Sequence, residues 1–110
     1  MLTFQTPSGH TILVGQNARE NDQLTFVTAK PMDLWFHVRD HPGAHVILRM
    51  DGPATDGDVY AAAFEAAQHS KAVKAVDVTV ARAIDVVRPR KARPGQVHVM
   101  TVLKTIRIRQ

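Results

Sequence analysis

Residues 15–49, with the sequence GQNARENDQLTFVTAKPMDLWFHVRDHPGAHVILR, contain the patterns that decide the fold. The first part of this segment predicts a helix over residues 17–29. Asn17 is a favourable N-cap residue, and Glu20 stands three positions later, as in a capping box. Pro31 cannot continue a helix, so we expect the helix to end just before it.

The second part of the segment predicts two strands joined by a tight turn. Residues 34–39 alternate between apolar side chains and larger polar or amphipathic ones, which is the two-residue period of a strand. A Pro-Gly pair at 42–43 indicates a turn, and a second strand is expected at 45–50. In such a hairpin, His37 and His45 can face each other across the two strands.

The rest of the chain supplies further strands on either side of a second helix. Residues 59–69 are rich in alanine and predict a helix, with Thr55 and Asp58 as an approximate capping box. Its alanines would pack closely on a sheet, and Tyr60 and Phe64 would add larger contacts. Alternating patterns predict strands at 11–14, 76–81, 84–87, 96–100 and 105–109, the first of them within an opening hairpin.

This order of elements indicates an α+β protein, with a largely antiparallel sheet and two packed helices. The chain of 110 residues has room for one core, so a single compact domain is expected over residues 1–110. Hydrophobic residues make up 45% of the chain and charged residues 22%, which is typical of a globular protein and argues against disorder.

Several classes of chemistry find no support in the sequence. Cysteine is absent, which excludes disulfides, thiolate catalysis and cysteine-based zinc sites. Ser8 and Ser70 lie in no nucleophile elbow, and the chain has neither an evident carboxylate pair nor a glycine-rich phosphate loop. We therefore expect no enzymatic activity and no cofactor. The start of the chain has no signal-peptide pattern, so a cytoplasmic location is expected.

The net charge of +4 hides a strong asymmetry along the chain. Residues 1–68 carry four basic and eight acidic residues, whereas residues 69–110 carry ten basic and two acidic residues. A basic C-terminal portion indicates a polyanionic partner such as nucleic acid. The alternative is a solvated basic surface that only keeps the protein soluble.

The basic residues of this portion concentrate in one segment. Residues 88–95 contain four cations, and two prolines stiffen the segment as an extended loop. Arg107 and Arg109 share one face of the last predicted strand, where a solvated edge is the simpler interpretation. The residues that we expect to follow an RNA backbone are Lys71, Lys74, Arg88, Arg90, Lys91 and Arg93.

Three histidines, His37, His41 and His45, are spaced by four residues. This spacing binds zinc on a helix, but a Pro-Gly turn interrupts the run and its flanks are strands, so we expect no metal site. Imidazole can donate, accept and stack, which suits contacts with phosphates and bases. The alternative is that His37 and His45 only anchor the hairpin.

The remaining candidate contacts lie in the same segment as these histidines. Trp35 is the only tryptophan, and it could stack on an unpaired base, a contact that contributes about 1–3 kcal/mol in other proteins. The alternative for Trp35 is a place in the core. Arg19 and Asn21 in the first helix, and Arg39 in the first hairpin strand, are further candidates for contact with a ligand.

Seen together, these residues resemble the signature of the NFACT-R domain, the RNA-binding module of ribosome quality-control factors. The similarity continues in the alanine-rich run before Ser70 and Lys71 and in residues 91–97. Ala44 departs from the pattern, because serine is common at that position. The matching residues are Gly15, Asn17, Ala18, Asn21, Asp22, Leu24, Thr25, Asp33, Leu34, Trp35, His37, Val38, Asp40, Pro42, Gly43, His45 and Val46.

The resemblance implies a non-catalytic domain that binds tRNA or large-subunit ribosomal RNA. An alternative is an accessory subunit that delivers tRNA to an RNA-modifying enzyme, for example in thiolation, and a third class is a small hydrolase or metalloprotein. Expected partners are therefore RNA, the large ribosomal subunit or a tRNA-modifying enzyme. The residues expected to contact RNA are Arg19, Asn21, Trp35, His37, Arg39, His45, Lys71, Lys74, Arg88, Arg90, Lys91 and Arg93.

Overall fold

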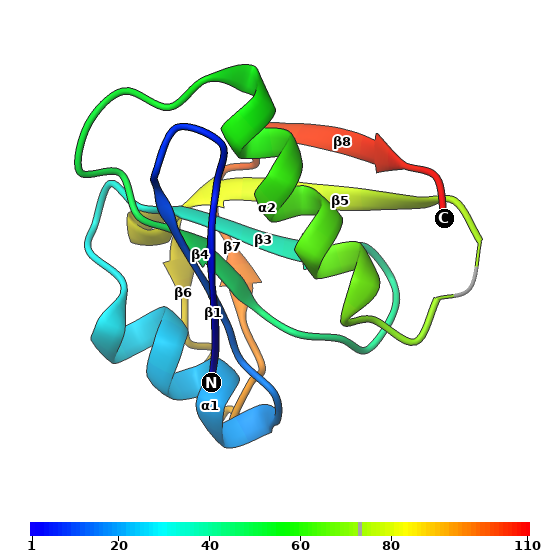
Figure 1. Cartoon of the computed structure of the whole chain (residues 1–110). Coiled ribbons are helices and arrows are strands. Elements are labelled where there is room, and N and C mark those ends of the chain that lie inside the picture. Colours follow the sequence, from blue (N-terminus) through cyan, green and yellow to red (C-terminus); the bar gives the residue numbers. More distant parts are fainter. Residues whose placement is uncertain (73) are drawn as a thin grey trace.

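The computed structural model describes residues 1–72 and 74–110, and these form an α+β structure around a six-stranded antiparallel sheet (Figure 1). The predicted fold class is confirmed. In the order in which they pair across the sheet, the strands are β1 (Leu2–Gln5), β2 (Thr11–Val14), β4 (Val46–Leu48), β3 (Leu34–Val38), β5 (Val76–Arg82) and β8 (Lys104–Ile108). The central position of β3 follows from its pairing with both β4 and β5.

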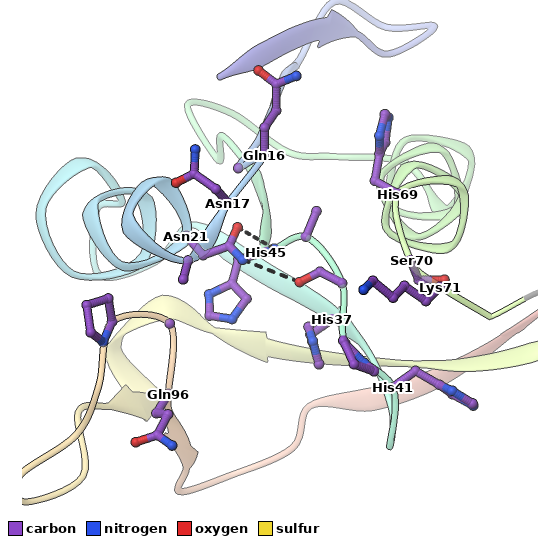
Figure 2. A pocket seen from close by; sticks show the side chains of 17 residues that line it. Gln16, Asn17, Asn21, His37, His41, His45, His69, Ser70, Lys71 and Gln96 are labelled. Atoms are coloured by element: carbon purple, nitrogen blue, oxygen red, sulfur yellow. Dashed lines mark hydrogen bonds between the residues drawn. The ribbon is translucent and has the colours of Figure 1, made fainter.

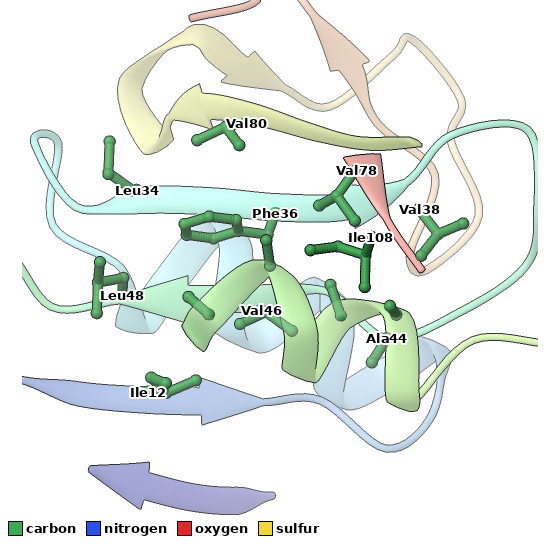
Figure 3. Close-up of a cluster of buried hydrophobic side chains, with 14 of the residues drawn as sticks. Ile12, Leu34, Phe36, Val38, Ala44, Val46, Leu48, Val78, Val80 and Ile108 are labelled. Atoms are coloured by element: carbon green, nitrogen blue, oxygen red, sulfur yellow. The ribbon is translucent and has the colours of Figure 1, made fainter. Parts of the chain in front are cut away.

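α2 (Asp56–Gln68) covers one face of this sheet. Its N-terminus is fixed by the predicted capping box, in which the Thr55 side chain accepts from the Asp58 N–H and the Asp58 carboxylate accepts from the Thr55 N–H. The helix presents four fully buried alanines to the sheet, so that its axis lies close to the strands. The buried side chains beneath it include Phe36 and Val46 (Figure 3). The alanines are Ala62, Ala63, Ala66 and Ala67.

The contacts predicted for Tyr60 and Phe64 are absent from this core. Both residues lie on the outer side of α2, where Tyr60 is 50% and Phe64 39% exposed. The close approach of the alanines explains this difference, because larger side chains at those four positions would push the helix away from the sheet.

The opposite face of the sheet is covered over part of its length. α1 (Ala18–Gln23) and the π-helical turn η1 (Leu24–Thr28) pack there together with a small second sheet. That sheet pairs β6 (Val86–Val87) with β7 (His98–Val99). The second buried cluster consists of Leu24, Trp35, Ile47, Ala81 and Val86. β3 is therefore buried on both of its faces.

The helix predicted over residues 17–29 is present, but it changes type along its length. Asn17 caps α1, since its side-chain oxygen accepts from the Glu20 N–H. The Glu20 carboxylate accepts from Gln16 and not from Asn17, so the capping box is incomplete. After Gln23 the turn widens, and the Ala29 N–H donates to Leu24, five residues back. No helix in the described part of the chain is long and apolar enough to span a membrane.

The strands predicted at 84–87 and 96–100 are shorter than expected and lie outside the main sheet. Residues 83–85 form a 3-10 turn (η2, Ala83–Asp85). The cause is a pair of hydrogen bonds, from the Ala83 N–H to Asp33 and from the Ile84 N–H to Pro31, which turn the chain away from β5. Only 86–87 and 98–99 then pair as strands.

His10 is buried beside the turn between β1 and β2, and it links three segments. Its Nδ1 lies 2.8 Å from the carbonyl oxygen of Arg49, and its Nε2 lies 3.0 Å from that of Pro53. Carbonyl oxygens only accept, so both bonds are made when both ring nitrogens carry a proton. These two bonds raise the pKa of His10, and the carboxylates of Asp58 and Asp51 add to this effect.

We predict that the free energy of unfolding decreases as the pH rises above about 6.5. A group whose pKa is higher in the folded protein than in the unfolded chain stabilises the fold fully below its unfolded pKa. That stabilisation is lost as the pH rises through the folded pKa. Urea unfolding at several pH values between about 6.5 and 9 measures this change.

The variant His10→Gln should lose most of this pH dependence, because glutamine does not titrate. His98→Gln, which replaces an exposed histidine in β7, is the matched control and should keep it. The same pH dependence in His10→Gln as in the unsubstituted protein would contradict the assignment.

Candidate functional site

A pocket of 960 Å³ opens where four segments of the chain meet (Figure 2). The segments are the start of α1, the end of β3 with the loop that leads to β4, the end of α2, and part of the loop between β6 and β7. Such a volume lies within the roughly 300–1,000 Å³ range of small-ligand sites. The residues that line the pocket are 15–18, Asn21, His37, 41–45, 69–71 and 94–96.

Asn21 joins α1 to the loop between β3 and β4. Its side-chain Nδ2–H donates to the carbonyl oxygen of Gly43 at 3.3 Å, and its Oδ1 accepts from the backbone N–H of His45 at 3.0 Å. Gly15 makes room for this amide, because a Cβ atom added there would lie 2.2 Å from Oδ1. Asn21 lines the pocket, but its amide is used to position the loop, in contrast to the ligand contact that we expected.

His45 is oriented by a chain of hydrogen bonds that starts in the core. The indole N–H of Trp35 donates to Oγ1 of Thr25 at 3.2 Å, and the same oxygen lies 2.8 Å from Nδ1 of His45. Among the described residues the Thr25 hydroxyl has no other acceptor, so it donates to Nδ1. The ring proton of neutral His45 is therefore on Nε2.

The Nε2–H group of His45 faces the pocket. This atom makes no hydrogen bond to any residue of the described ranges 1–72 and 74–110. His45 is only 3% exposed, but every fully buried side-chain nitrogen or oxygen in those ranges has a partner, so the small exposed area of His45 includes Nε2, at the pocket that His45 lines. The indole of Trp35 supports the ring from below, with its centroid 5.2 Å from that of His45 and the two planes nearly perpendicular.

His37 and His45 face each other across β3 and β4, as predicted. Their ring centroids lie 5.4 Å apart and their planes are nearly perpendicular, while His37 stacks on Trp35 at 5.8 Å. Burial lowers the pKa of His37. Burial, together with the neighbouring His37, lowers the pKa of His45 to about 4. Both imidazoles are therefore neutral at neutral pH.

The role expected for Trp35 as a stacking surface for a base is wrong. Its side chain is 1% exposed and lies between the sheet and η1, so neither face of the indole is open to a ligand. The alternative of a place in the core is confirmed. Trp35 acts on the pocket through the two histidines that it contacts.

The loop between β6 and β7 reaches the pocket because Asp22 holds it against α1. The Asp22 carboxylate accepts from the Arg88 guanidinium at 2.7 Å and from the Gly95 N–H at 3.3 Å. The guanidinium of Arg88 also lies over the ring of Phe26, at 4.5 Å from its centroid. These contacts place residues 94–96 at the pocket. They also give Arg88 an internal role.

The predicted basic residues divide into two groups. Lys71 lines the pocket, and Arg90, Lys91 and Arg93 are exposed on the loop whose end forms one wall. The second group is neither in the pocket lining nor among the loop cations at 90–93, which themselves lie just before the lining residues 94–96. This group consists of Arg19, Arg39, Lys74 and Arg88.

The Arg39 side chain lies 3.8 Å from the carboxylate of its neighbour Asp40, and both side chains are exposed. Arg107 forms an ion pair with Asp77 on the edge strand β8, in agreement with the simpler interpretation of that face. Of the predicted RNA-contact residues, the structure therefore brings Asn21, His37, His45 and Lys71 together.

Several pocket residues, among them His69, Ser70 and the segment 94–96, were not predicted as site residues, although Ser70 and residues 91–97 belong to the family resemblance. These residues lie far in sequence from α1, and no local pattern connects them to it. The only local signals were the Pro-Gly pairs at 42–43 and 94–95, which mark turns near the pocket. Within the described part of the chain, no group of three or more His, Asp or Glu side chains is arranged to hold a metal ion.

We predict that Thr25→Val lowers the free energy of unfolding by roughly 1–3 kcal/mol, because it leaves the Trp35 N–H and His45 Nδ1 unpaired in the interior. Thr28→Val, in the same turn, is the matched control, since the Thr28 side chain makes no hydrogen bond to a described residue. Urea unfolding measures both variants, and equal stability of the two would argue against the hydrogen-bond chain.

Comparison with known proteins places this site in a family. The family described as "NFACT protein RNA binding domain" matches residues 1–100. The chain is 40% identical over 97 residues to the Rqc2 homolog RqcH of Bacillus subtilis (strain 168), an alignment that covers 84% of this chain. It is 42% identical over 89 residues, or 76% of this chain, to the Rqc2 homolog RqcH of Streptococcus suis (strain 05ZYH33). The chain spans 16% of the length of each of these relatives.

A solved structure agrees with this comparison. The C-terminal part of the fibronectin/fibrinogen-binding protein from Streptococcus suis superimposes with a TM-score of 0.90 and 36% sequence identity. The match covers 97% of this chain and 44% of that chain. The resemblance inferred from residues 15–49 is thus confirmed over nearly the whole sequence, and the chain belongs to the NFACT-R family of RNA-binding domains.

Proposed function

We propose that this domain binds structured RNA, either tRNA or RNA of the large ribosomal subunit, and that it catalyses no reaction on that RNA. The observation that carries the proposal is the arrangement of cations around the pocket. Lys71 stands on one side, at the end of α2, and the basic loop 88–95 stands on the other side. The phosphates of a folded RNA could be contacted from both sides at once.

The charges of these cations are available for a ligand. The ion pairs between described residues involve none of Lys71, Arg90, Lys91 and Arg93. All four side chains are exposed. Release of counterions from RNA by such residues would make the affinity strongly dependent on salt.

The names of the relatives favour a role in ribosome quality control over the delivery of tRNA to a modifying enzyme. Both curated relatives carry the name Rqc2 homolog, which favours the ribosome quality-control side of the family resemblance. The chain corresponds to 16% of their length, so we assign it RNA contact alone. The alternative is an accessory subunit that delivers tRNA to a modifying enzyme, and in that case such an enzyme should copurify with the protein.

The proposal is tested by binding of the purified domain to total tRNA and to isolated large ribosomal subunits over a range of salt concentrations. Salt-sensitive binding to either would support the proposal and would identify the RNA. Absence of binding to both at low salt would overturn it.

We predict that the double variant Lys71→Gln, Lys91→Gln weakens RNA binding and makes the affinity less sensitive to salt. The slope of log affinity against log salt should fall by roughly one for each phosphate that a lysine no longer neutralises. The matched control is Lys30→Gln, Lys104→Gln. Lys30 precedes β3, at the other end of that strand from His37, and Lys104 lies on the face of β8 that is directed toward α2.

The control should retain both the affinity and the salt slope of the unsubstituted domain. Equal losses of affinity in the two double variants would mean that RNA affinity depends only on the net charge of the domain. In that case Lys71 and Lys91 would not be specific contacts of the RNA.

A further inference from the structure

We infer that the pocket holds a single unpaired nucleobase of the bound RNA, and that the Nε2–H of His45 donates a hydrogen bond to an acceptor atom on that base. This inference rests on the proposed function, because it names the part of the RNA that enters the pocket. The base would lie between the start of α1 and the end of α2, where Figure 2 shows His37 and His45.

Most polar side chains of the pocket wall are already engaged in holding the wall together. Asn17 caps α1, and both ends of the Asn21 amide bind the loop 43–45. Ser70 donates to the carbonyl oxygen of Ala67, and Gln96 accepts from the Arg93 N–H. These side chains give the pocket its shape.

Beside the exposed side chains of His41 and Lys71, the groups left for a ligand are the imidazoles of His37 and His45. The His37 ring makes no hydrogen bond to a described residue, and neither does Nε2 of His45. Because no buried side-chain nitrogen or oxygen in the described ranges lacks a partner, these atoms must be accessible. Their ring centroids lie 5.4 Å apart with nearly perpendicular planes, and both residues line the same pocket.

The floor of the pocket, formed by the uncharged rings of His37 and His45, is better suited to a nucleobase than to a phosphate. The lowered pKa values of His37 and His45 leave both rings uncharged at neutral pH. A phosphate placed against them would lose hydration without meeting a cation, which is costly. A base edge carries both donors and acceptors and no charge, and neutral imidazoles offer both kinds of group.

The cations lie where the rest of a nucleotide would extend. Lys71 belongs to the pocket lining, and the exposed cations Arg90, Lys91 and Arg93 directly precede the lining residues 94–96, whereas the two imidazoles are uncharged. A base in the pocket would leave its ribose and phosphates at the opening of the pocket. An unpaired base is the usual point of specific recognition in RNA, because its edge is not occupied by pairing.

The first test uses the unsubstituted domain and NMR spectra of the histidine rings and of the Trp35 indole N–H. Trp35 is the only tryptophan and contacts both histidines, so its signal reports on the pocket floor. The domain is titrated with each of the four nucleoside 5′-monophosphates and, separately, with ribose 5-phosphate. We expect at least one nucleotide to shift the His37, His45 and Trp35 signals, and ribose 5-phosphate to leave them unchanged.

The second test compares two substitutions of the same residue. His45→Gln keeps an N–H donor near the place of Nε2, whereas His45→Asn removes it and keeps a polar atom near the place of Nδ1. His45→Asn should weaken binding of the responsive nucleotide by roughly three- to tenfold, and His45→Gln should weaken it less. Thermal unfolding of both variants establishes that they are folded.

The outcomes separate this inference from the proposed function. Equal shifts from ribose 5-phosphate and from nucleotides would show a phosphate site. No shift from any nucleotide, or unchanged affinity in a folded His45→Asn variant, would mean that the pocket holds no base. If tRNA or the large subunit still binds in those cases, the proposed function stands and only the base pocket is wrong. If neither RNA binds, both proposals are wrong.

Discussion

The burial of β3 on both faces is the constraint on which the rest of the structure depends. On the side of α2 it requires only apolar side chains, which Leu34, Phe36 and Val38 provide. On the other side, Trp35 brings an indole N–H into the interior, and a buried donor needs an acceptor. Thr25 supplies the acceptor, and its own hydroxyl proton in turn needs one, which is Nδ1 of His45. The packing of the core thereby determines that His45 carries its proton on Nε2. This N–H group, whose position is fixed by the hydrogen bonds of the interior, is the donor at the pocket.

The same burial explains why the histidines of the site are neutral while its exposed lysine and arginine side chains are charged. Imidazoles that lie against an indole and beneath two packed segments lose the hydration that would stabilise their cations, so His37 and His45 stay neutral. Lysine and arginine side chains are long enough to keep their charges in water, and those of Lys71, Arg90, Lys91 and Arg93 are exposed. His10 shows the opposite case. It is also buried, but two carbonyl oxygens and a buried carboxylate face its ring, and these favour the protonated form.

The sequence predicted those features that depend on residues a few positions apart. The capping box of α2, the cap of α1 and the hairpin that sets His37 opposite His45 follow from local spacing, and the structure has all of them. Apart from the contacts expected of Tyr60 and Phe64 on α2, the predictions that were wrong concern the second face of the sheet. Whether Trp35 is covered, and whether residues 84–87 join the main sheet, depends on contacts with distant segments. Asp22 and Arg88 are 66 residues apart in the chain, and nothing in the local pattern of either predicts their ion pair. The family could be identified because its signature is dense within residues 15–49, whereas the position of residues 94–96 at the pocket could not be predicted, although residues 91–97 are part of the resemblance.

The position of the pocket follows from where the cover of that second face ends. Trp35 and Ala81, which pair across β3 and β5, are fully buried under η1 and the small sheet. Two residues further along, His37 pairs with Thr79, and Thr79 pairs with Thr105; these side chains are half-buried or exposed. A polar group at this boundary can be supported by the core on one side and still reach a ligand on the other. The basic character of residues 69–110 alone would not have located this place, because Arg88 and Arg107 are paired with carboxylates and Lys104 lies on the opposite face. The position of the site is therefore set by the edge of the second hydrophobic cluster, which contains Trp35 and Ala81. The basic residues of the C-terminal portion contribute to the site only where they lie near that edge.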